Sequence, residues 1–406
     1  MASFGEFRQH WRPLLACFIG MGSALSVNSY ILSTFAPYLI EEFGWSRSQW
    51  ALAGIVQMLL MVSLPLAGRL TDIYGPRRVA AVGALSFPLF LVAIAMMNGD
   101  IRVYLGIYIA QTIICSTTTS TVYSRVVAEV FKIRRGLALA IAGMSPPLIG
   151  ALGAPLMTSF VQGHGWRSGY LTVAAFSAVC AVVTLSLLPK GRPGATAQNP
   201  ASASAPSFGG AFRVISRTPA FWVMIVATLL INLPFALAAS QLKLVILDQG
   251  ISDSNAALLI SAFALGSVLG RIISGTALDI LPAHGIATIN FGLPAVGLLM
   301  LASGHDSLPV VGLAIILIGV SFGGEGDILP YLVTRHFEIS VFSTVLGLLT
   351  SATGISVAMG NAILGLTLAA TDSFHTYLLT AAACSFIGSL GFLMLGRPAF
   401  HRPASA

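Results

Sequence analysis

Charged residues are scarce in this sequence. Aspartate, glutamate, lysine and arginine make up only 9% of the 406 residues, whereas hydrophobic residues make up 56%. Soluble domains carry roughly 25% charged residues, so this chain has too little polar surface to face water on all sides. The composition excludes an ordinary soluble protein and predicts an all-α membrane protein that crosses the bilayer many times.

The sequence also lacks the patterns on which metal, disulfide and catalytic chemistry depend. The four cysteines are scattered through apolar segments, which excludes a paired zinc spacing and a disulfide framework. No two of the seven histidines have the spacing of metal ligands, and no phosphate-binding glycine loop or nucleophile elbow is present. We therefore expect no enzyme, no cofactor and no metal site.

Twelve apolar segments run through the chain, most of them about 20 residues long or more, which is enough to cross a bilayer as a helix. They cover residues 13–39, 51–68, 79–97, 104–127, 136–161, 169–188, 219–246, 255–277, 286–303, 309–333, 341–369 and 374–396. The stretch from Pro189 to Gly210 is rich in proline, alanine, serine and glycine, which is typical of a flexible linker. The sequence thus predicts a six-helix bundle at 1–188, a cytoplasmic linker at 189–218 and a second six-helix bundle at 219–406.

Lysine and arginine are distributed unevenly between the predicted loops. If the N-terminus is cytoplasmic, 15 of the 21 lie in inward-facing segments, and the outward-facing ones are Arg47, Arg102 and Arg167. This bias predicts a multi-pass protein with both termini in the cytoplasm, and we expect it in the inner membrane of a bacterium. The net charge of +7 needs no nucleic-acid partner, because the basic residues are scattered along the inner loops.

The two halves of the sequence contain a related pattern at equivalent places. GRLTDIYGPRR starts at Gly68 after the second apolar segment, and SGTALDI starts at Ser274 after the eighth. In both, an aspartate follows a glycine by four positions, which places Asp72 and Asp279 at the inner end of the second helix of each half. Such a repeat is typical of transporters whose substrate site lies between two related halves.

The first of these segments carries a family resemblance. GRLTDIYGPRR resembles the signature of the loop between the second and third helices in the major facilitator superfamily. The matching residues are Gly68, Leu70, Asp72, Gly75, Arg77 and Arg78, while Ile73 and Pro76 replace two usual basic residues. The resemblance implies the major facilitator fold, with twelve transmembrane helices in two six-helix bundles, and secondary transport by alternating access.

A longer segment, from Val130 to Pro155, resembles the monocarboxylate porter and oxalate/formate antiporter branch through its VFKIRRGLALAIAG stretch. In that branch an arginine on the eighth span engages the substrate carboxylate, and Arg271 stands at the matching place. The chain lacks the span-one lysine that animal monocarboxylate porters use for proton coupling, and the span-eleven lysine that holds a second carboxylate in the oxalate antiporter. The resemblance implies a monocarboxylate and leaves proton symport and anion exchange both open.

Arg271 is a permanent cation within an apolar segment. A charged side chain at membrane depth costs at least ~2.5–3.5 kcal/mol, so it tends to face a cavity or an opposite charge. Its planar guanidinium suits a carboxylate, which makes Arg271 the first candidate for substrate binding. The alternative is a structural ion pair with Glu325, which a rise of ~1.5 Å per residue places at a similar depth on the tenth span. Glu325 and Asp327 are also candidates for carrying the coupling proton.

Four further polar residues are candidates for substrate contact. Lys243 and Gln241 lie near the outer end of the seventh span, where Lys243 either binds an anion or extends to the membrane interface. Asn28 and Tyr30 lie on the first span, where they either line a cavity or bond to neighbouring helices.

Other charged residues are expected to act in gating. Arg125 and Glu129 are four residues apart on one helical face, which predicts an ion pair. Asp72, with basic residues of its loop such as Arg78, and Asp279 in the second half are expected to form contacts between helices at the inner face. We expect these contacts to hold an outward-open state and to break when the bundles rock.

These observations favour one function over two alternatives. We expect a monomeric secondary transporter whose partners are the lipid bilayer, a small organic anion and, in the case of symport, a proton. The first alternative is an exporter of hydrophobic or aromatic compounds, since one fold serves many substrates. The second is a non-transporting membrane sensor or assembly partner, which is disfavoured because the sequence contains no soluble signalling domain.

Overall fold

The computed structural model describes residues 2–45, 56, 58–190, 212–213, 215–304, 307–371 and 373–396, and every secondary-structure element in them is a helix. The chain divides into two compact units. Unit 1 consists of Met1–Ile133, Ile141–Pro206 and Ile339–Gly347, and unit 2 of Arg134–Ala140, Ser207–Glu338 and Leu348–Ala406. Each unit therefore includes one short segment from the other half of the sequence. Most of the predicted linker at 189–218 lies outside the described residues, and the domain boundaries predicted there stay a prediction.

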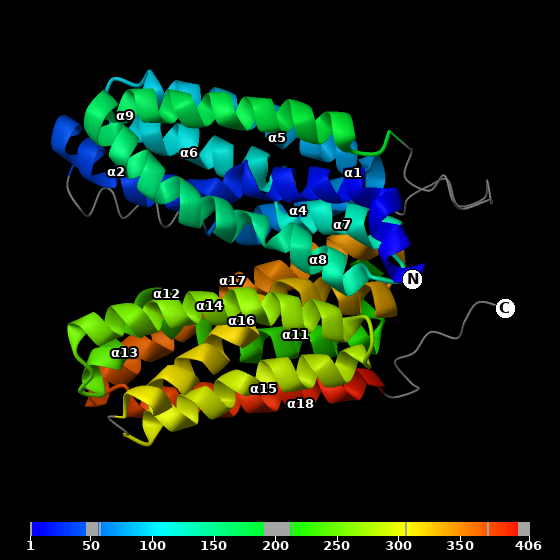
Figure 1. Ribbon diagram of the computed structural model, residues 1–406, viewed down its shortest axis with the longest axis vertical. Coiled ribbons are helices and arrows are strands. Elements are labelled where there is room, and N and C mark those ends of the chain that lie inside the picture. Colours follow the sequence, from blue (N-terminus) through cyan, green and yellow to red (C-terminus); the bar gives the residue numbers. More distant parts are fainter. Residues whose placement is uncertain are drawn as a thin grey trace. The chain divides into compact units, whose positions relative to one another are not determined.

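The helices within each unit run alongside one another (Figure 1). In the first half of the chain they are α1 (Ala2–Gly22), η1 (Leu25–Val27), α2 (Asn28–Phe43), α4 (Leu60–Tyr74), α5 (Pro76–Ala95), α6 (Ile101–Cys115), η2 (Ser116–Thr118), α7 (Ser120–Val130), α8 (Arg135–Gly143) and α9 (Ser145–Leu187). In the second half they are α11 (Pro219–Ile231), α12 (Phe235–Ser240), α13 (Leu242–Asp248), α14 (Asp253–Leu278), α15 (Ala283–Ala302), α16 (Leu308–His336), η4 (Ile339–Val341), α17 (Phe342–Thr371), α18 (His375–Leu393) and η5 (Met394–Gly396).

Eight helical stretches among the described residues are long and apolar enough to cross a membrane. Large apolar side chains on them, such as those of Leu89, Leu152 and Leu366, are exposed, as expected for helices whose outer faces meet lipid. Four of the twelve predicted segments, 13–39, 104–127, 136–161 and 219–246, are divided into shorter helices. The segment 51–68 lies partly outside the described residues.

Side-chain hydroxyl groups explain one of these divisions. Ser116, Thr117 and Thr118 each donate a hydrogen bond to the carbonyl oxygen three residues earlier, at 2.7–2.8 Å. These bonds satisfy carbonyl groups that a continuous α-helix would use, and the backbone tightens there into the 3-10 turn η2. A second boundary, between the predicted spans 136–161 and 169–188, lies within α9 at Gly165. Its backbone φ of 78° is a left-handed value that glycine adopts without strain, and it interrupts the helix there.

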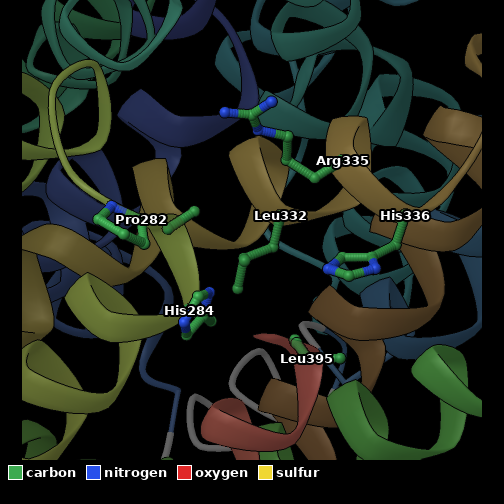
Figure 2. Close-up of a pocket in the computed structure, with 7 residues that line it drawn as sticks. Pro282, His284, Leu332, Arg335, His336 and Leu395 are labelled. Atoms are coloured by element: carbon green, nitrogen blue, oxygen red, sulfur yellow. The ribbon is translucent and has the colours of Figure 1, made fainter. Parts of the chain in front are cut away.

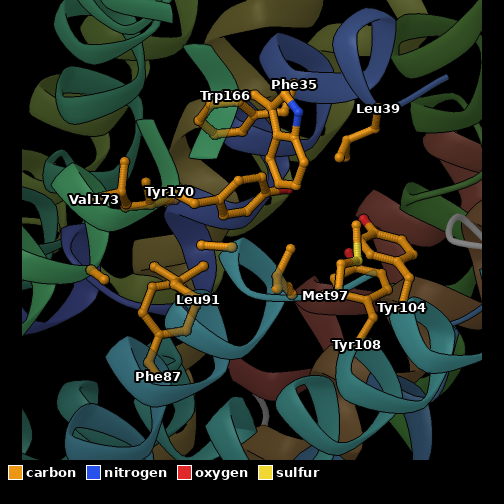
Figure 3. Packing of buried hydrophobic residues seen from close by; sticks show 14 of the residues in the cluster. Phe35, Leu39, Phe87, Leu91, Met97, Tyr104, Tyr108, Trp166, Tyr170 and Val173 are labelled. Atoms are coloured by element: carbon orange, nitrogen blue, oxygen red, sulfur yellow. The ribbon is translucent and has the colours of Figure 1, made fainter. Parts of the chain in front are cut away.

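The core of unit 1 is rich in aromatic side chains (Figure 3). The rings of Phe35 and Tyr170 stack with centroids 4.2 Å apart, and Trp166 meets Tyr170 edge-on at 5.9 Å. Tyr104 and Tyr108 stack along α6. Aromatic pairs in these geometries contribute about 0.5–1.5 kcal/mol beyond the area they bury, so this cluster fixes how α2, α6 and α9 pack within the unit.

The aromatic core continues to one end of unit 1, where it meets an exposed ion pair. Glu42 accepts hydrogen bonds from Trp166 Nε1 and from the Arg167 guanidinium, both at 2.5 Å. The hydrogen bond from Trp166 is the first cause that lowers the pKa of the Glu42 carboxyl group, and Arg167 lowers it further. This contact links the end of α2 to the second part of α9.

Unit 2 is organised around the crossing of α14 and α16. Glycines on both helices bring the backbones together, because the position that a Cβ would take at Gly270 or Gly323 is already filled by backbone atoms of Val320 or Ser267. Small residues four positions apart permit such close approach between membrane helices. The crossing places Arg271, which follows Gly270 directly, against α16.

Candidate functional site

Arg271 on α14 forms an ion pair with Asp327 on α16. The guanidinium Nη1 donates to Asp327 Oδ1 at 3.0 Å, with 19% of the arginine side chain and 1% of the aspartate side chain exposed. The sequence predicted an acidic partner on this span but placed it two residues earlier, at Glu325. Two residues on an α-helix differ by roughly 200° in direction, so Glu325 and Asp327 point to different sides of α16.

The surroundings of this ion pair are asymmetric. Asp327 Oδ1 binds Arg271, whereas Oδ2 is buried and has no hydrogen-bond partner among the described residues. On the arginine side, Nη2 lies against Gly326, where an added Cβ would approach it to 3.0 Å. The glycine therefore leaves room for the guanidinium between α14 and α16. One carboxylate oxygen is thus without a hydrogen-bond partner among the described residues, and the arginine side chain is partly exposed.

Glu325 lies in a second polar cluster, built from three helices of unit 2. Asn232, at the end of α11, donates from Nδ2 to Glu325 Oε1 at 2.8 Å, and the Thr353 hydroxyl on α17 donates to the same oxygen at 3.2 Å. Neither Asn232 nor Thr353 was among the site residues predicted from the sequence. A neutral amide in the middle of the largely apolar segment 219–246 was the available signal for Asn232.

Lys243 and Gln241 lie where the seventh predicted span bends. Gln241 joins α12 to α13 with a φ of −128°, which is outside the helical range, and it is half-buried. Lys243 follows on α13 and is exposed. Their role in substrate binding stays a prediction.

Asn28 of unit 1 is bonded to a neighbouring helix. Its Nδ2 donates to Gln111 Oε1 on α6 at 3.4 Å, and both side chains are buried. This contact is the helix-bonding role that the sequence offered as an alternative to lining a cavity. Tyr30 lies in α2, and its side chain is outside the described part of the structure.

Asp72 binds the start of α17, within unit 1. It accepts from the backbone N–H of Ser343 at 3.1 Å and of Thr344 at 2.8 Å, and from the Thr344 hydroxyl at 2.6 Å. It also pairs with Arg125 on α7, whose Nε donates to Glu129 at 2.8 Å. The basic partner of Asp72 is thus Arg125, and Arg78 lies exposed on the first turn of α5.

Asp279 makes the equivalent contact within unit 2. Its Oδ1 accepts from the backbone N–H of Gly136 at 2.7 Å, and its Oδ2 from that of Leu137 at 3.1 Å. Both amides belong to the first turn of α8, as those bound by Asp72 belong to the first turn of α17. The first N–H groups of a helix have no partner within it, so each carboxylate caps a helix N-terminus from a distant part of the sequence.

Among the described residues, no group of three or more histidine, cysteine, aspartate and glutamate side chains could hold a metal ion. Arg271 and Asp327 place a guanidinium and a buried carboxylate side by side in unit 2.

Comparison with curated proteins identifies distant relatives across most of the chain. Monocarboxylate transporter 4 of Rattus norvegicus is 24% identical over 397 residues, which cover 95% of this chain and 82% of that protein. Monocarboxylate transporter 11 of Homo sapiens is 23% identical over 380 residues, which cover 89% of this chain and 77% of that protein. The chain is thus distantly related to monocarboxylate transporters.

Solved structures show the same fold. A major facilitator superfamily transporter, FucP, in the outward conformation matches with a TM-score of 0.76 at 13% identity, over 96% of this chain and 99% of that one. The proton:xylose symporter XylE matches with a TM-score of 0.71 at 13% identity, over 95% of this chain and 94% of that one. Residues 16–361, well over half of the chain, match the family described as Major Facilitator Superfamily. The protein is therefore a multi-pass integral membrane protein rather than an enzyme, and it belongs to the major facilitator superfamily of secondary transporters.

Proposed function

We propose that this transporter carries small organic anions, and specifically monocarboxylates, with Arg271 as the residue that binds the substrate carboxylate. The observation that carries the proposal is the ion pair between Arg271 and Asp327, in which the buried carboxylate is paired with an arginine whose side chain is still 19% exposed. A guanidinium binds a planar carboxylate through two parallel hydrogen bonds. Arg271 already binds one carboxylate in this structure, and a substrate carboxylate is a chemically equivalent partner.

Charge balance favours one carboxylate per substrate. Arg271 is a strong fixed cation for one carboxylate, and α17 contains no charged residue that could hold a second one. The names of the relatives, monocarboxylate transporters 4 and 11, support the same substrate class. The remainder of the substrate would contact the apolar side chains that make up most of these helices.

Asp327 gives this site a route to proton symport. When Asp327 accepts a proton, its carboxyl group becomes neutral and its attraction to Arg271 falls, which frees the guanidinium for the substrate carboxylate. Release of the substrate reverses the exchange: the proton leaves Asp327, and the carboxylate pairs with Arg271 again. Proton and monocarboxylate are thus carried together, and no unpaired charge remains at the site in either state. In anion exchange, the carboxylate of a second substrate, and not that of Asp327, would pair with Arg271 after the first substrate leaves.

We further propose that the protein works as a monomer in the inner membrane of a bacterium, with both termini in the cytoplasm. The excess of lysine and arginine in the predicted inner loops supports this orientation. Tags at each terminus should be cleaved by protease only in inside-out vesicles.

The binding role is tested with purified protein in liposomes and labelled lactate as the probe. Arg271→Gln removes the guanidinium group, its charge and its two parallel hydrogen bonds to the substrate carboxylate. At about 1.5–3 kcal/mol for each charge-assisted hydrogen bond, we expect the affinity for lactate to fall by about a hundredfold or more. Because Arg271→Gln leaves Asp327 unpaired, the double variant Arg271→Gln/Asp327→Asn provides a folding control with a neutral pair. If either variant takes up lactate as the unmodified protein does, Arg271 is not the carboxylate site.

The coupling role is tested with Asp327→Asn, which mimics the neutral aspartic acid permanently. We expect it to retain exchange of lactate across the membrane and to lose accumulation driven by a pH gradient. Asp248→Asn is the matched control, because Asp248 is exposed at the end of α13. Accumulation that persists in Asp327→Asn would show that the proton is carried elsewhere, with Glu325 as the next residue to test.

A further inference from the structure

A cavity of about 290 Å³ lies at one end of unit 2, away from the ion pair described above. Three basic side chains line it: His284 from the first turn of α15, and Arg335 and His336 from the last turn of α16. Figure 2 shows the two imidazole rings approaching the same space from opposite sides of Leu332, with Leu395 completing the wall. Among the described residues, those that line the cavity include no acidic side chain.

Unit 1 contains a related cavity at the equivalent point of its own helix order. This cavity, of about 160 Å³, is lined by Arg77 and Arg78 from the first turn of α5 and by Lys190 just after α9. Glu129 also lines it, but its carboxylate is bonded to Arg125. In each half of the chain, the third span begins at such a cavity, and the ends of the fourth and sixth spans contribute to it. The cavity therefore recurs with the internal repeat.

The charges around the unit 2 cavity are arranged to receive an anion. The N-terminus of a helix carries a partial positive charge and unpaired N–H groups, and acidic side chains usually offset them. The first turn of α15 has no acidic residue and instead presents His284. Arg335 adds a permanent cation. The first turn of α5 likewise has no acidic residue. An anion in the cavity would satisfy the helix end and the basic side chains together.

The edge of the cavity is apolar. Ile280 and Leu281, which directly precede the cavity residue Pro282, are 74% and 52% exposed. Leu393 and Met394, which precede Leu395, are 47% and 37% exposed. A free phosphate ion has no apolar part that could contact these side chains. A phospholipid would place its phosphate among the basic groups and its acyl chains along the exposed apolar residues.

We propose that the unit 2 cavity binds the phosphate headgroup of an anionic phospholipid through His284, Arg335 and His336. The lipid would tie together the N-terminus of α15, the C-terminus of α16 and the turn η5 that follows α18. This site is separate from the proposed carboxylate site at Arg271, so it stands or falls independently of the transported substrate.

The test compares lipid binding to the purified full-length protein in detergent, by native mass spectrometry and by the shift of thermal unfolding. The probes are phosphatidylglycerol, phosphatidylcholine and inorganic phosphate. We expect phosphatidylglycerol to be retained and to stabilise the protein more than the other two. In His284→Gln/Arg335→Gln its apparent affinity should fall by about tenfold or more, as expected for the loss of a charge-assisted contact. Arg335→Lys, which keeps the charge, should retain most of the preference.

The matched control is Arg8→Gln/His164→Gln, which removes the same two residue types from exposed positions that do not line the cavity. Equal retention of phosphatidylglycerol and phosphatidylcholine, or unchanged phosphatidylglycerol affinity in the cavity variant, would overturn the proposal. Stabilisation by inorganic phosphate equal to that by phosphatidylglycerol would overturn the lipid assignment in favour of a soluble phosphate compound. Should the double variant fail to fold, Arg335→Gln alone must still lower the affinity.

Discussion

Replacing Asp72 with asparagine should loosen the start of α17. The carboxylate accepts two backbone N–H groups, one hydroxyl and the Arg125 guanidinium. An asparagine amide keeps one accepting oxygen, but its NH2 group would face the Thr344 N–H, and the contact with Arg125 changes from a charged to a neutral hydrogen bond. Loss of one charge-assisted bond, at about 1.5–3 kcal/mol, and weakening of the others give a total of about 3 kcal/mol. That corresponds to about a hundredfold increase in local opening.

Hydrogen–deuterium exchange measures this opening at the amides that the carboxylate binds. In Asp72→Asn, we expect faster exchange in a peptide that contains Ser343 and Thr344. Asp279→Asn should act in the same way on Gly136 and Leu137, because its two oxygens accept from those amides at 2.7 and 3.1 Å. Each variant is a control for the other in its effect on folding and charge.

The exchange patterns of the two variants also show whether each carboxylate protects only the helix start that it caps. If the carboxylates act as separate caps, each variant accelerates exchange mainly at its own helix start. Unchanged exchange at Ser343 and Thr344 in Asp72→Asn would refute the reasoning, because those amides would then be protected by something other than the carboxylate. Transport assays on the same variants would show whether these caps control gating, as we predict.

Three further predictions concern stability, measured by thermal unfolding in detergent. Gly323→Ala should destabilise the protein by about 1–3 kcal/mol through overpacking, because the new Cβ would lie 2.6 Å from the Ser267 carbonyl carbon. Gly365→Ala is the control and should be neutral or stabilising, because its Cβ would meet no atom within 4 Å. Equal effects of the two substitutions would contradict the close helix crossing. Arg69→Met should stabilise the protein by about 2–3 kcal/mol, because all three guanidinium nitrogens of Arg69 are buried without a hydrogen-bond partner among the described residues. A loss of stability in this variant would show that the guanidinium makes a stabilising contact. Glu42→Gln should remove about 0.2–1 kcal/mol at neutral pH. Because the pKa of Glu42 is lowered on folding, this contribution is present above its unfolded pKa of about 4.3 and disappears as the pH falls through the folded value, so the difference between the two proteins should vanish in acid.

The sequence predicted the surroundings of Arg271, the proposed carboxylate site, only in part. Arg271 stood out because a permanent cation in an apolar segment requires a partner, and an acidic partner on the tenth span was expected for the same reason. Which acid it would be depended on the rotation of α16 against α14. That rotation is set by the glycine contacts at Gly270 and Gly323, and it turned Asp327 rather than Glu325 toward the guanidinium.

Contacts between distant segments were the least predictable. Arg125 and Glu129 lie four residues apart on one helix, so their ion pair followed from helical spacing and is present. The role of Asp72 as a cap for α17 did not follow, because its partners are backbone amides about 270 residues away. Backbone N–H groups carry no sequence signal, and only the folded chain shows which helix start lies beside which carboxylate.

The sequence by itself determined that this protein lies in a membrane, its helical class and its family, and it singled out Arg271, the cation that we propose binds an organic anion. Those properties follow from composition, from the length of apolar segments and from short motifs, all of which are local along the chain. Only the tertiary structure decided which acid neutralises Arg271, where the long apolar segments break, and which basic residues line a common cavity. Those outcomes depend on helix rotation and on the approach of separate backbones, and both are set by packing between parts of the chain that are far apart in sequence.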